Sequence, residues 1–387
     1  MIHNTRIKAM TGGYAVAEAL RQIHPDVMAV YPITPQTPII ETYAKMKADG
    51  LVETEIVQVE SEHSALSATL GACASGARAV TATSSQGLMY MAEVLPIVSG
   101  LQLPVVMYVS ARALSAPLNI HGEHGDVMAV RDLGWIQIFS EDAQEAYENT
   151  IIGLKLAETV NAPVMPIMDG FHTSHTTERV ELFDDETVKK FVGERNPGQS
   201  LTDFENPITI GTLAVQNAYF EFKIDQEQAM QQAKEAYKKI CDELGRISGK
   251  KHGLFETYHL EDADSAIVMM GATAGTVKAT VDRLRAQGKK VGMLSIKLYR
   301  PFPYKEVAQA LAHVKKIAVL DRAISFGAYP PLYQDVSCAL YFASARKHEA
   351  ASYIYGLGGR DTMQSHIEQV FVDLENGKLS HEVRYLQ

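Results

Sequence analysis

The chain has 387 residues, enough for two or three domains, and 46% of them are hydrophobic. Its 36 Lys and Arg residues are outnumbered by 46 Asp and Glu residues, which gives a net charge of −10. We expect no nucleic-acid partner, because phosphate binding needs clustered basic side chains. No apolar run reaches the roughly 18 residues of a membrane helix, and the N-terminus lacks the apolar core of a signal peptide. We therefore expect no membrane partner and a cytoplasmic location.

The cysteines Cys73, Cys241 and Cys338 lie far apart in the sequence, and none belongs to a C-x-x-C pair. This spacing argues against a disulfide framework, a four-cysteine zinc site and a cubane iron–sulfur cluster within this chain. We expect each cysteine to be a small buried apolar residue, and we assign no metal ligand to this chain.

The first half of the chain alternates strands and helices. Helical spacing covers residues 11–20, and a helix of small residues with Ser61 as its N-cap follows the second strand. An apolar helix is predicted over residues 88–98. The strands are predicted over residues 27–31, 55–60, 79–83, 103–109 and 162–168. Such alternation indicates an α/β fold with a mostly parallel sheet and helices on both faces.

From about Arg179 to Leu254 the sequence is more polar, and a helix is predicted from about Gln226 to Arg246. Its apolar stripe is formed by Met230, Ala233, Ala236 and Tyr237. A second α/β unit follows, with strands predicted over residues 266–270, 290–295 and 316–320. We expect a first domain over 1–255, with the polar extension starting near 179, and a second domain over 256–387.

The segment Tyr31-Pro-Ile-Thr-Pro-Gln-Thr-Pro38 lies just beyond the first strand. In open α/β sheets, ligands bind at the carboxyl edge of the strands, so Thr34 and Thr37 can present their hydroxyls there. A rigid connector, in which one of these threonines caps the next helix, explains the same residues. The residues alone leave both interpretations open.

Two charged residues follow other strands of the same sheet. Glu62 is either a first-turn carboxylate that favours the helix dipole, or a carboxylate delivered into a cleft where it can exchange a proton. Arg112 follows the strand at 103–109 among small residues. Its guanidinium suits bidentate binding of a carboxylate, but it can equally cap backbone carbonyls.

Two glycine-containing segments are less specific. The stretch from Asn119 to Asp126 is dense in polar residues but has no recognised metal-ligand spacing. The turn from Gly356 to Asp361 could hold a phosphate on its N–H groups. A tight strand-to-helix turn accounts for it at least as well.

Taken together, these segments are more specific than any one of them. They occur in order along the chain as Tyr31–Pro38, Val59–Ser64, Thr81–Leu88, Arg112–Pro117, Arg131–Trp135, Leu298–Pro303, Leu320–Ser325 and Gly356–Asp361. The chain thereby resembles the alpha subunits of 2-oxoacid:ferredoxin oxidoreductases, most closely those of the pyruvate:ferredoxin (pyruvate synthase) type. The resemblance implies a pyrimidine-binding domain of the thiamine-diphosphate-binding fold, followed by a transketolase C-terminal-like domain.

The resemblance also implies the reaction and its components. Pyruvate would be oxidatively decarboxylated with coenzyme A to acetyl-CoA and CO₂, and electrons would pass to ferredoxin. Thiamine diphosphate would be shared with a beta subunit, and Mg²⁺ and [4Fe-4S] clusters would be held mainly by partner chains. Gamma and delta subunits, or fused equivalents, would complete the complex. The alternative substrates for such a complex are 2-oxoglutarate, a branched-chain 2-oxoacid or oxalate. An alternative of another class is that the chain is a non-catalytic scaffold or a nucleotide-binding subunit.

By the same resemblance, Glu62 would be the catalytic carboxylate, bonded to N1′ of the thiamine pyrimidine. Thr34 and Arg112 would bind the substrate carboxylate. The cofactor-binding residues would be Pro32, Ile33, Glu62, Ser85 and Gln86. Thr34 argues against oxalate as the substrate, because in the oxalate-using relative this position resembles an Arg. The loop from Ile120 to Asp126 departs from the Trp-Asn-Asp pattern common in pyruvate-type chains.

Overall fold

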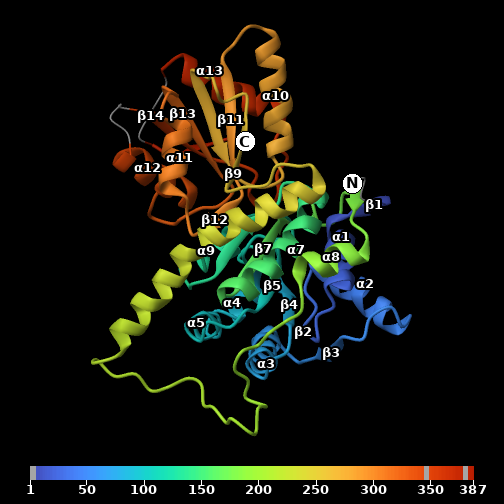
Figure 1. Cartoon of the computed structure of the whole chain (residues 1–387). Coiled ribbons are helices and arrows are strands. Elements are labelled where there is room, and N and C mark those ends of the chain that lie inside the picture. Colours follow the sequence, from blue (N-terminus) through green and yellow to red (C-terminus); the bar gives the residue numbers. More distant parts are fainter. Residues whose placement is uncertain (1–5, 344–347, 378–381) are drawn as a thin grey trace.

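The computed structural model describes residues 6–343, 348–377 and 382–387. It contains two large sheets, and the elements of the second half lie above those of the first half in Figure 1. The first sheet has the order β12-β6-β7-β5-β4-β2-β3. Its strands are β2 (Val27–Val30), β3 (Glu55–Gln58), β4 (Ala79–Thr83), β5 (Val106–Ala111), β6 (Ile136–Phe139), β7 (Val164–Asp169) and β12 (Leu298–Arg300). All neighbours in it are parallel except β12, which is antiparallel to β6.

The second sheet has the order β15-β14-β13-β10-β11-β9, with β9 antiparallel to β11 and the other pairs parallel. Its strands are β9 (Phe255–Tyr258), β10 (Ser265–Met269), β11 (Val291–Ile296), β13 (Lys316–Asp321), β14 (Glu349–Ile354) and β15 (Arg384–Tyr385). A separate antiparallel ribbon joins β1 (Arg6–Thr11) to β8 (Thr177–Leu182). The α/β class and the mostly parallel sheets are therefore confirmed.

Helices connect these strands. They are α1 (Gly12–Ile23), α2 (Thr37–Ala48), α3 (Glu62–Ala74), α4 (Ser85–Tyr90), α5 (Leu95–Gly100), α6 (Gly125–Ala129), α7 (Ala143–Val160), α8 (Asp185–Val192), α9 (Tyr219–Ser248), α10 (Ala274–Ala286), α11 (Tyr304–Leu311), α12 (Pro331–Ala343) and α13 (Gln364–Glu375). Ser61 is the N-cap of α3, as predicted, and its hydroxyl accepts a hydrogen bond from the Ser64 N–H at 3.2 Å. The apolar helix predicted over 88–98 is instead two short helices, α4 and α5, joined by a turn.

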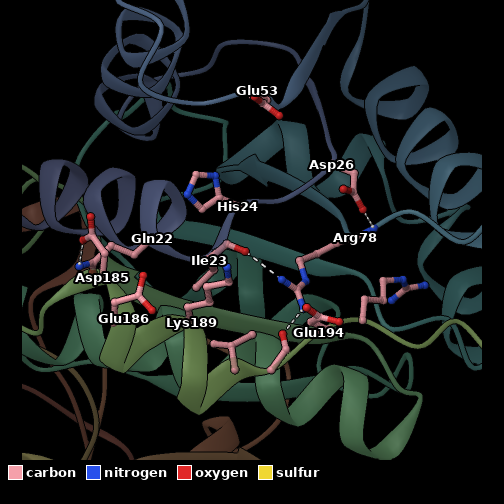
Figure 2. A pocket seen from close by; sticks show the side chains of 13 residues that line it. Gln22, Ile23, His24, Asp26, Glu53, Arg78, Asp185, Glu186, Lys189 and Glu194 are labelled. Carbon is pink, nitrogen blue, oxygen red and sulfur yellow. Dashed lines mark hydrogen bonds between the residues drawn. The ribbon is translucent and has the colours of Figure 1, made fainter.

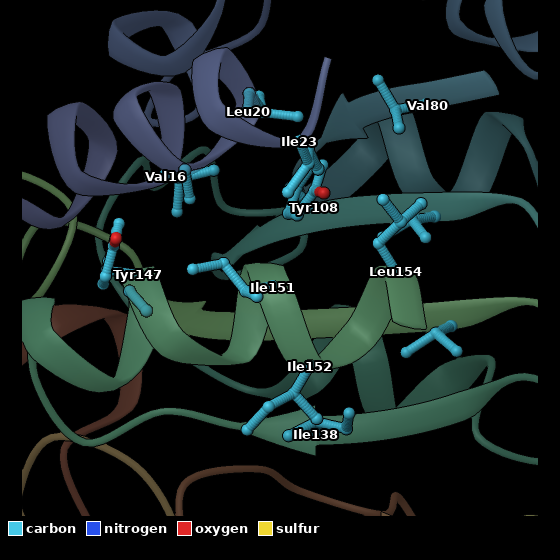
Figure 3. Packing of buried hydrophobic residues seen from close by; sticks show 14 of the residues in the cluster. Val16, Leu20, Ile23, Val80, Tyr108, Ile138, Tyr147, Ile151, Ile152 and Leu154 are labelled. Carbon is cyan, nitrogen blue, oxygen red and sulfur yellow. The ribbon is translucent and has the colours of Figure 1, made fainter. Parts of the chain in front are cut away.

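The core of the first sheet lies between its strands and the long helix α7. Figure 3 shows Ile151 and Leu154 of α7 facing Tyr108 of β5, with Val16 and Leu20 of α1 above them. These side chains are at most 3% exposed. The apolar positions of α7 recur at helical spacing, so one face of the helix can be buried along its length.

The two halves of the chain are joined by a common apolar core and by a strand of the second half that pairs within the first sheet. One buried cluster extends from Leu66 of α3 and Met107 of β5 to Val268 and Leu294 in the second sheet. The second half also supplies β12, which pairs with β6 at the edge of the first sheet. The two sheets are therefore parts of one packed body.

Helix α9 packs against α7 and α5 and carries the predicted apolar stripe. Ala233 and Tyr237 are buried, and Met230 and Ala236 pack against the same core. Figure 1 shows the chain before α9, residues 195–218, as a long excursion beyond the first sheet. None of the described helices combines the length and the hydropathy needed to cross a membrane.

The cysteines only partly follow the expectation. Cys73 and Cys241 are buried, but Cys338 on α12 is exposed. The prediction that all three are buried is therefore wrong for Cys338, because it lies on the solvent side of a helix that buries Val336 and Ala339.

Candidate active site

The candidate site residues lie beyond the carboxyl ends of adjacent strands. Strands β3, β2, β4 and β5 are neighbours and parallel, so their carboxyl ends meet at one edge of the first sheet. The loop after β2 contains Thr34, Glu62 begins the helix after β3, Ser85 follows β4, and Arg112 follows β5. The topology therefore gathers residues that are up to 78 positions apart in the sequence.

Glu62 is the first residue of α3 and is only 8% exposed. Its carboxylate makes no hydrogen bond to any residue that the structure describes. A Cβ added to Gly87 would lie 2.7 Å from Glu62 Oε1 and 2.5 Å from the hydroxyl of Thr83. That hydroxyl is also buried and without a hydrogen-bond partner in the described part of the chain. The absent side chain at Gly87 therefore leaves Glu62 and Thr83 room for a partner from outside this chain.

Arg112 and Thr34 are brought into direct contact. Arg112 is 6% exposed, and its Nη1 donates to the carbonyl of Thr34 at 2.8 Å. Its Nε donates to the carbonyl of Asn119 at 3.0 Å. These bonds fix the plane of the guanidinium, and Nη2 has no hydrogen-bond partner among the described residues. Burial lowers the pKa of Arg112 from its ordinary value, and the nearby Asp126 opposes this. The structure thus shows Arg112 on backbone carbonyls, and binding of a carboxylate by Nη2 stays a prediction.

Ser85 and Gln86 form the turn from β4 into α4. Ser85 adopts a φ of 50°, and its hydroxyl lies 2.5 Å from the carbonyl of Ala113, to which it donates. Gln86 Nε2 lies 3.4 Å from the carbonyl of Ser115. In the preceding loop, Pro32 is exposed and Ile33 half-buried, so both reach the surface at the same edge.

Asp126 lies beneath these residues. It is fully buried, and its Oδ2 accepts hydrogen bonds from the backbone N–H of Ser85 at 2.8 Å and of Arg112 at 3.0 Å. Burial raises the pKa of Asp126 to about 7, although these N–H groups and His124 favour the charged form. The sequence showed Asp126 only as one of several polar residues in a loop, and its partners are 14 and 41 positions away.

The glycine turn after β14 contacts this same loop. The N–H of Gly358 donates to the Glu123 carboxylate at 3.0 Å, and the N–H of Gly359 donates to the carbonyl of Gly122 at 3.0 Å. Asn119 Nδ2 donates to the carbonyl of Gly358 at 3.0 Å. Since these N–H groups already bind residues of the first half, the turn joins the two halves, and a phosphate on it would have to displace those contacts.

A buried charged cluster lies behind the loop. His124 Nε2 and Arg322 Nη1 lie 2.7 and 3.0 Å from Oδ1 of Asp169, the last residue of β7. The N–H of Ala272 donates to Asp169 Oδ2 at 2.6 Å. Burial alone would raise the pKa of Asp169, but the charges of His124 and Arg322 outweigh it and hold the pKa below its ordinary range. No pattern in the sequence indicates this cluster, because its members lie on both halves of the chain.

A group of carboxylates elsewhere has the geometry of a cation site. Oxygens of Glu141, Glu145 and Glu256 lie within 4.8 Å of one another. However, Lys297 Nζ lies 2.7 Å from Glu141 and 2.6 Å from Glu145, and Lys278 Nζ lies 2.8 Å from both Glu141 and Glu256. The two lysines therefore already supply the positive charge that these carboxylates require.

A cavity of about 580 Å³ lies at the opposite edge of the first sheet (Figure 2). Asp26, Glu53 and Arg78, which line it, directly precede or lie close before β2, β3 and β4. Arg78 binds the Glu158 carboxylate through Nε and Nη2, at 2.8 and 2.9 Å, and donates to the carbonyl of Ile23. This cavity is distant from Glu62 and Arg112, and its central cation is already paired.

Comparison with known families identifies the class of protein to which this fold belongs. The chain belongs to the family described as pyruvate flavodoxin/ferredoxin oxidoreductase, thiamine-diphosphate binding, whose profile matches residues 18–242. Residues 263–367 match a second profile, pyruvate:ferredoxin oxidoreductase core domain II. The resemblance deduced from the motifs is therefore confirmed.

Several curated relatives match almost the whole chain. Pyruvate synthase subunit PorA of Thermotoga maritima is 51% identical, over 98% of this chain and 97% of its own length. The subunit of the same name from Methanocaldococcus jannaschii is 42% identical, over 96% of each. Ketoisovalerate oxidoreductase subunit VorA of Pyrococcus horikoshii is 41% identical, over 100% of this chain and 99% of its own. The subunit names indicate that these relatives act in multi-subunit oxidoreductases.

A solved structure supports the fold. The 2-oxoglutarate:ferredoxin oxidoreductase from Magnetococcus marinus, determined with 2-oxoglutarate, coenzyme A and succinyl-CoA bound, matches with a TM-score of 0.73 at 21% identity. The match covers 96% of this chain and 66% of that chain. The described part of our chain therefore has the fold of this oxidoreductase class.

Proposed function

We propose that this chain is the alpha subunit of a pyruvate:ferredoxin oxidoreductase and that its strand-end site forms half of the thiamine-diphosphate site. One observation carries the proposal. The buried Glu62 carboxylate has no hydrogen-bond partner in the described part of the chain, and neither does Nη2 of the buried Arg112. Both lie beyond the carboxyl ends of parallel strands of one sheet. A carboxylate can bind the ring nitrogen of a cofactor, and a guanidinium can bind the carboxylate of a small acid.

Glu62 would hold the pyrimidine end of thiamine diphosphate. Thiamine diphosphate supplies, when bound, the carbon nucleophile and the electron sink of the reaction. The Glu62 carboxylic group would share a proton with the pyrimidine N1′, which favours the ring form that activates the cofactor. The surrounding turns, with Pro32, Ile33, Ser85 and Gln86, would line the ring.

Arg112 and Thr34 would orient the 2-oxoacid. Arg112 Nη2 would bind the substrate carboxylate, while Nε and Nη1 stay on their backbone carbonyls. The exposed side chain of Thr34 lies on the loop that Arg112 holds. A neutral Thr34 suits an acid with one carboxylate and disfavours oxalate.

Pyruvate is the preferred substrate in this proposal. The relatives named pyruvate synthase include one at 51% identity, whereas those named ketoisovalerate oxidoreductase reach 42% identity. The latter names favour a branched-chain 2-oxoacid as the second candidate. The overall reaction would convert pyruvate and coenzyme A to acetyl-CoA and CO₂, and two electrons would go singly to ferredoxin.

The remaining components would be supplied by other chains in a cytoplasmic complex. A beta subunit would hold the diphosphate, Mg²⁺ and a [4Fe-4S] cluster, with gamma and delta subunits completing electron transfer. Large apolar side chains that are at least 83% exposed support such assembly. They are Phe204, Leu213, Phe326 and Phe342. We also propose that residues 1–255 act as the pyrimidine-binding part and 256–387 as the transketolase C-terminal-like part.

Turnover of the purified complex tests the proposal. The complex would be assayed anaerobically with coenzyme A and ferredoxin on pyruvate, 3-methyl-2-oxobutanoate, 2-oxoglutarate and oxalate. We expect the highest kcat/KM with pyruvate, and strict dependence on added thiamine diphosphate after its removal. Preference for the branched-chain acid would support the second candidate, and no turnover of any 2-oxoacid would refute both.

A further inference from the structure

Asp126 ties together two strand ends of the candidate site. Its Oδ2 accepts the N–H of Ser85, which follows β4, and the N–H of Arg112, which follows β5. Its other oxygen, Oδ1, accepts the N–H of Val127 at 2.8 Å. The carboxylate is 0% exposed, so none of these bonds competes with water.

One of the two strand ends needs this support. Ser85 has a φ of 50°, in the left-handed region that residues with a Cβ seldom occupy. Its N–H points at Asp126, and its hydroxyl binds the carbonyl of Ala113. Residues in such conformations persist where their surroundings hold them, and here the buried carboxylate binds the backbone of Ser85 while Ala113 and Gln86 contact its hydroxyl.

Each strand end leads to a different part of the site. The turn at Ser85 sets the position of Gly87, which approaches the Glu62 carboxylate closely. Arg112 reaches the Thr34 carbonyl with its side chain. A displacement of Asp126 would therefore move the cofactor side and the substrate side relative to each other.

We propose that Asp126 is a positioning residue that sets the separation between the cofactor-facing Glu62–Gly87 contact and the substrate-facing guanidinium of Arg112. This inference rests on the proposed function, since it assigns those two sides to thiamine diphosphate and to a 2-oxoacid. Asp126 itself touches neither, because it is covered by the turns it holds. Its effect passes through the backbone of Ser85 and Arg112.

Two variants of the complete complex test this role. Asp126→Ala removes all three hydrogen bonds, whereas Asp126→Asn keeps an oxygen that can accept from Ser85 and Arg112. The pyruvate KM and kcat would be measured, together with the Kd of thiamine diphosphate for the cofactor-free complex by fluorescence titration. We expect Asp126→Ala to raise both KM and Kd about tenfold or more, and Asp126→Asn to raise each only about two- to fivefold.

Asp321 provides a matched control. It is also a buried carboxylate at the end of a strand, and it accepts the N–H groups of Leu332 and Tyr333 at 2.7 and 3.1 Å. Asp321→Asn should leave the pyruvate KM and the cofactor Kd within about twofold of wild type. A comparable shift in this control would show general destabilisation and would overturn the positioning role.

The remaining outcomes distinguish failure of the positioning role from failure of the proposed function. If Asp126→Ala assembles and keeps wild-type KM and Kd, the inference fails while the proposed function stands. If Asp126→Ala does not assemble, Asp126→Asn decides, and unchanged values for it overturn the inference. If the wild-type complex neither turns over a 2-oxoacid nor binds thiamine diphosphate, the proposed function itself fails.

Discussion

Arg322 Nη1 lies 3.0 Å from Asp169 Oδ1, and this ion pair joins the end of β13 in the second sheet to the end of β7 in the first. Both side chains are at most 2% exposed. Arg322 also donates to the carbonyl of Gly356 through Nε, and its own carbonyl accepts the N–H of His124. The two halves are therefore joined immediately behind the loop that leads into α6, the helix that carries Asp126.

Loss of this ion pair should destabilise the chain strongly. Arg322→Ala would leave Asp169 buried with one charged partner fewer, and we expect a loss of about 3–5 kcal/mol in the free energy of unfolding. Chemical denaturation of the full chain measures it. Arg283→Ala is the control, because the pair of Arg283 with Glu368 is 44% and 33% exposed and should contribute about 0–1 kcal/mol. Equal losses for the two variants would contradict the buried role of Arg322.

Glu62→Gln should abolish most of the turnover. The amide keeps the size of the side chain but cannot share a proton with a ring nitrogen in the same way, so kcat should fall about 10²- to 10⁴-fold. Glu60→Gln removes an exposed carboxylate two residues earlier and should leave kcat nearly unchanged. Near-wild-type kcat for Glu62→Gln would reduce Glu62 to a favourable charge at the start of α3.

Arg112→Lys should weaken substrate binding although the charge is kept. A lysine ammonium cannot hold the carbonyls of Thr34 and Asn119 and also present a planar N–H edge. We expect the pyruvate KM to rise about tenfold or more, with a smaller change in the Kd of thiamine diphosphate. Arg179→Lys, at a side chain that is 63% exposed, is the control. An unchanged KM for Arg112→Lys would leave Arg112 with a purely structural role.

Gly87→Ala tests the space beside Glu62. The new Cβ would meet Glu62 Oε1 at 2.7 Å and the Thr83 hydroxyl at 2.5 Å, so the carboxylate must move. We expect a fall in kcat of about tenfold or more, because catalytic groups depend on placement within fractions of an ångström. Gly275→Ala, where a Cβ meets nothing within 4 Å, should not affect kcat. Full activity of Gly87→Ala would show that the site tolerates a shifted carboxylate.

The raised pKa of Asp321 should be visible in the pH dependence of the free energy of unfolding. Burial raises the pKa of Asp321 to about 7 from its ordinary value of 3.8. Between these values the folded chain keeps a proton that the unfolded chain has released, so the free energy of unfolding falls as pH rises from about 4 to about 7. Relative to Asp321→Asn, wild type should lose up to about 1.4 kcal/mol per pH unit in this window. Parallel pH profiles for the two proteins would contradict the raised pKa. Burial also raises the pKa values of Asp126 and Glu148 to about 7. The wild-type profile is therefore compared with that of Asp321→Asn, which keeps both of these groups.

The sequence predicted those features that depend on local pattern. Strand β4 was predicted with its observed bounds, and β2 begins at the predicted residue and ends before Pro32. Once β2, β4 and β5 lie side by side as parallel strands, Thr34 and Arg112 stand at the same edge of the sheet. The Ser61 cap followed from the same local logic.

Features that depend on distant contacts were not predictable in this way. The break between α4 and α5 is an exception, because Pro96 in the first turn of α5 marks it locally, and the prediction of one helix over 88–98 overlooked it. The partners of Asp126 and Asp169 come from separate strands, and no periodicity in the sequence indicates which polar residue meets which. Strand β12 has only the residues Leu298–Arg300, and nothing in so short a run indicates that it belongs to the first sheet.

Strand β12 has a consequence for any attempt to divide this protein. Its pairing covers one side of β6, whose backbone would otherwise end the first sheet with unpaired N–H and C=O groups. If residues 1–255 were produced alone, β6 would become an open edge that can pair with strands from other molecules. Aggregation of the separated piece would then reflect the missing three residues from the second half rather than a poorly folded first half.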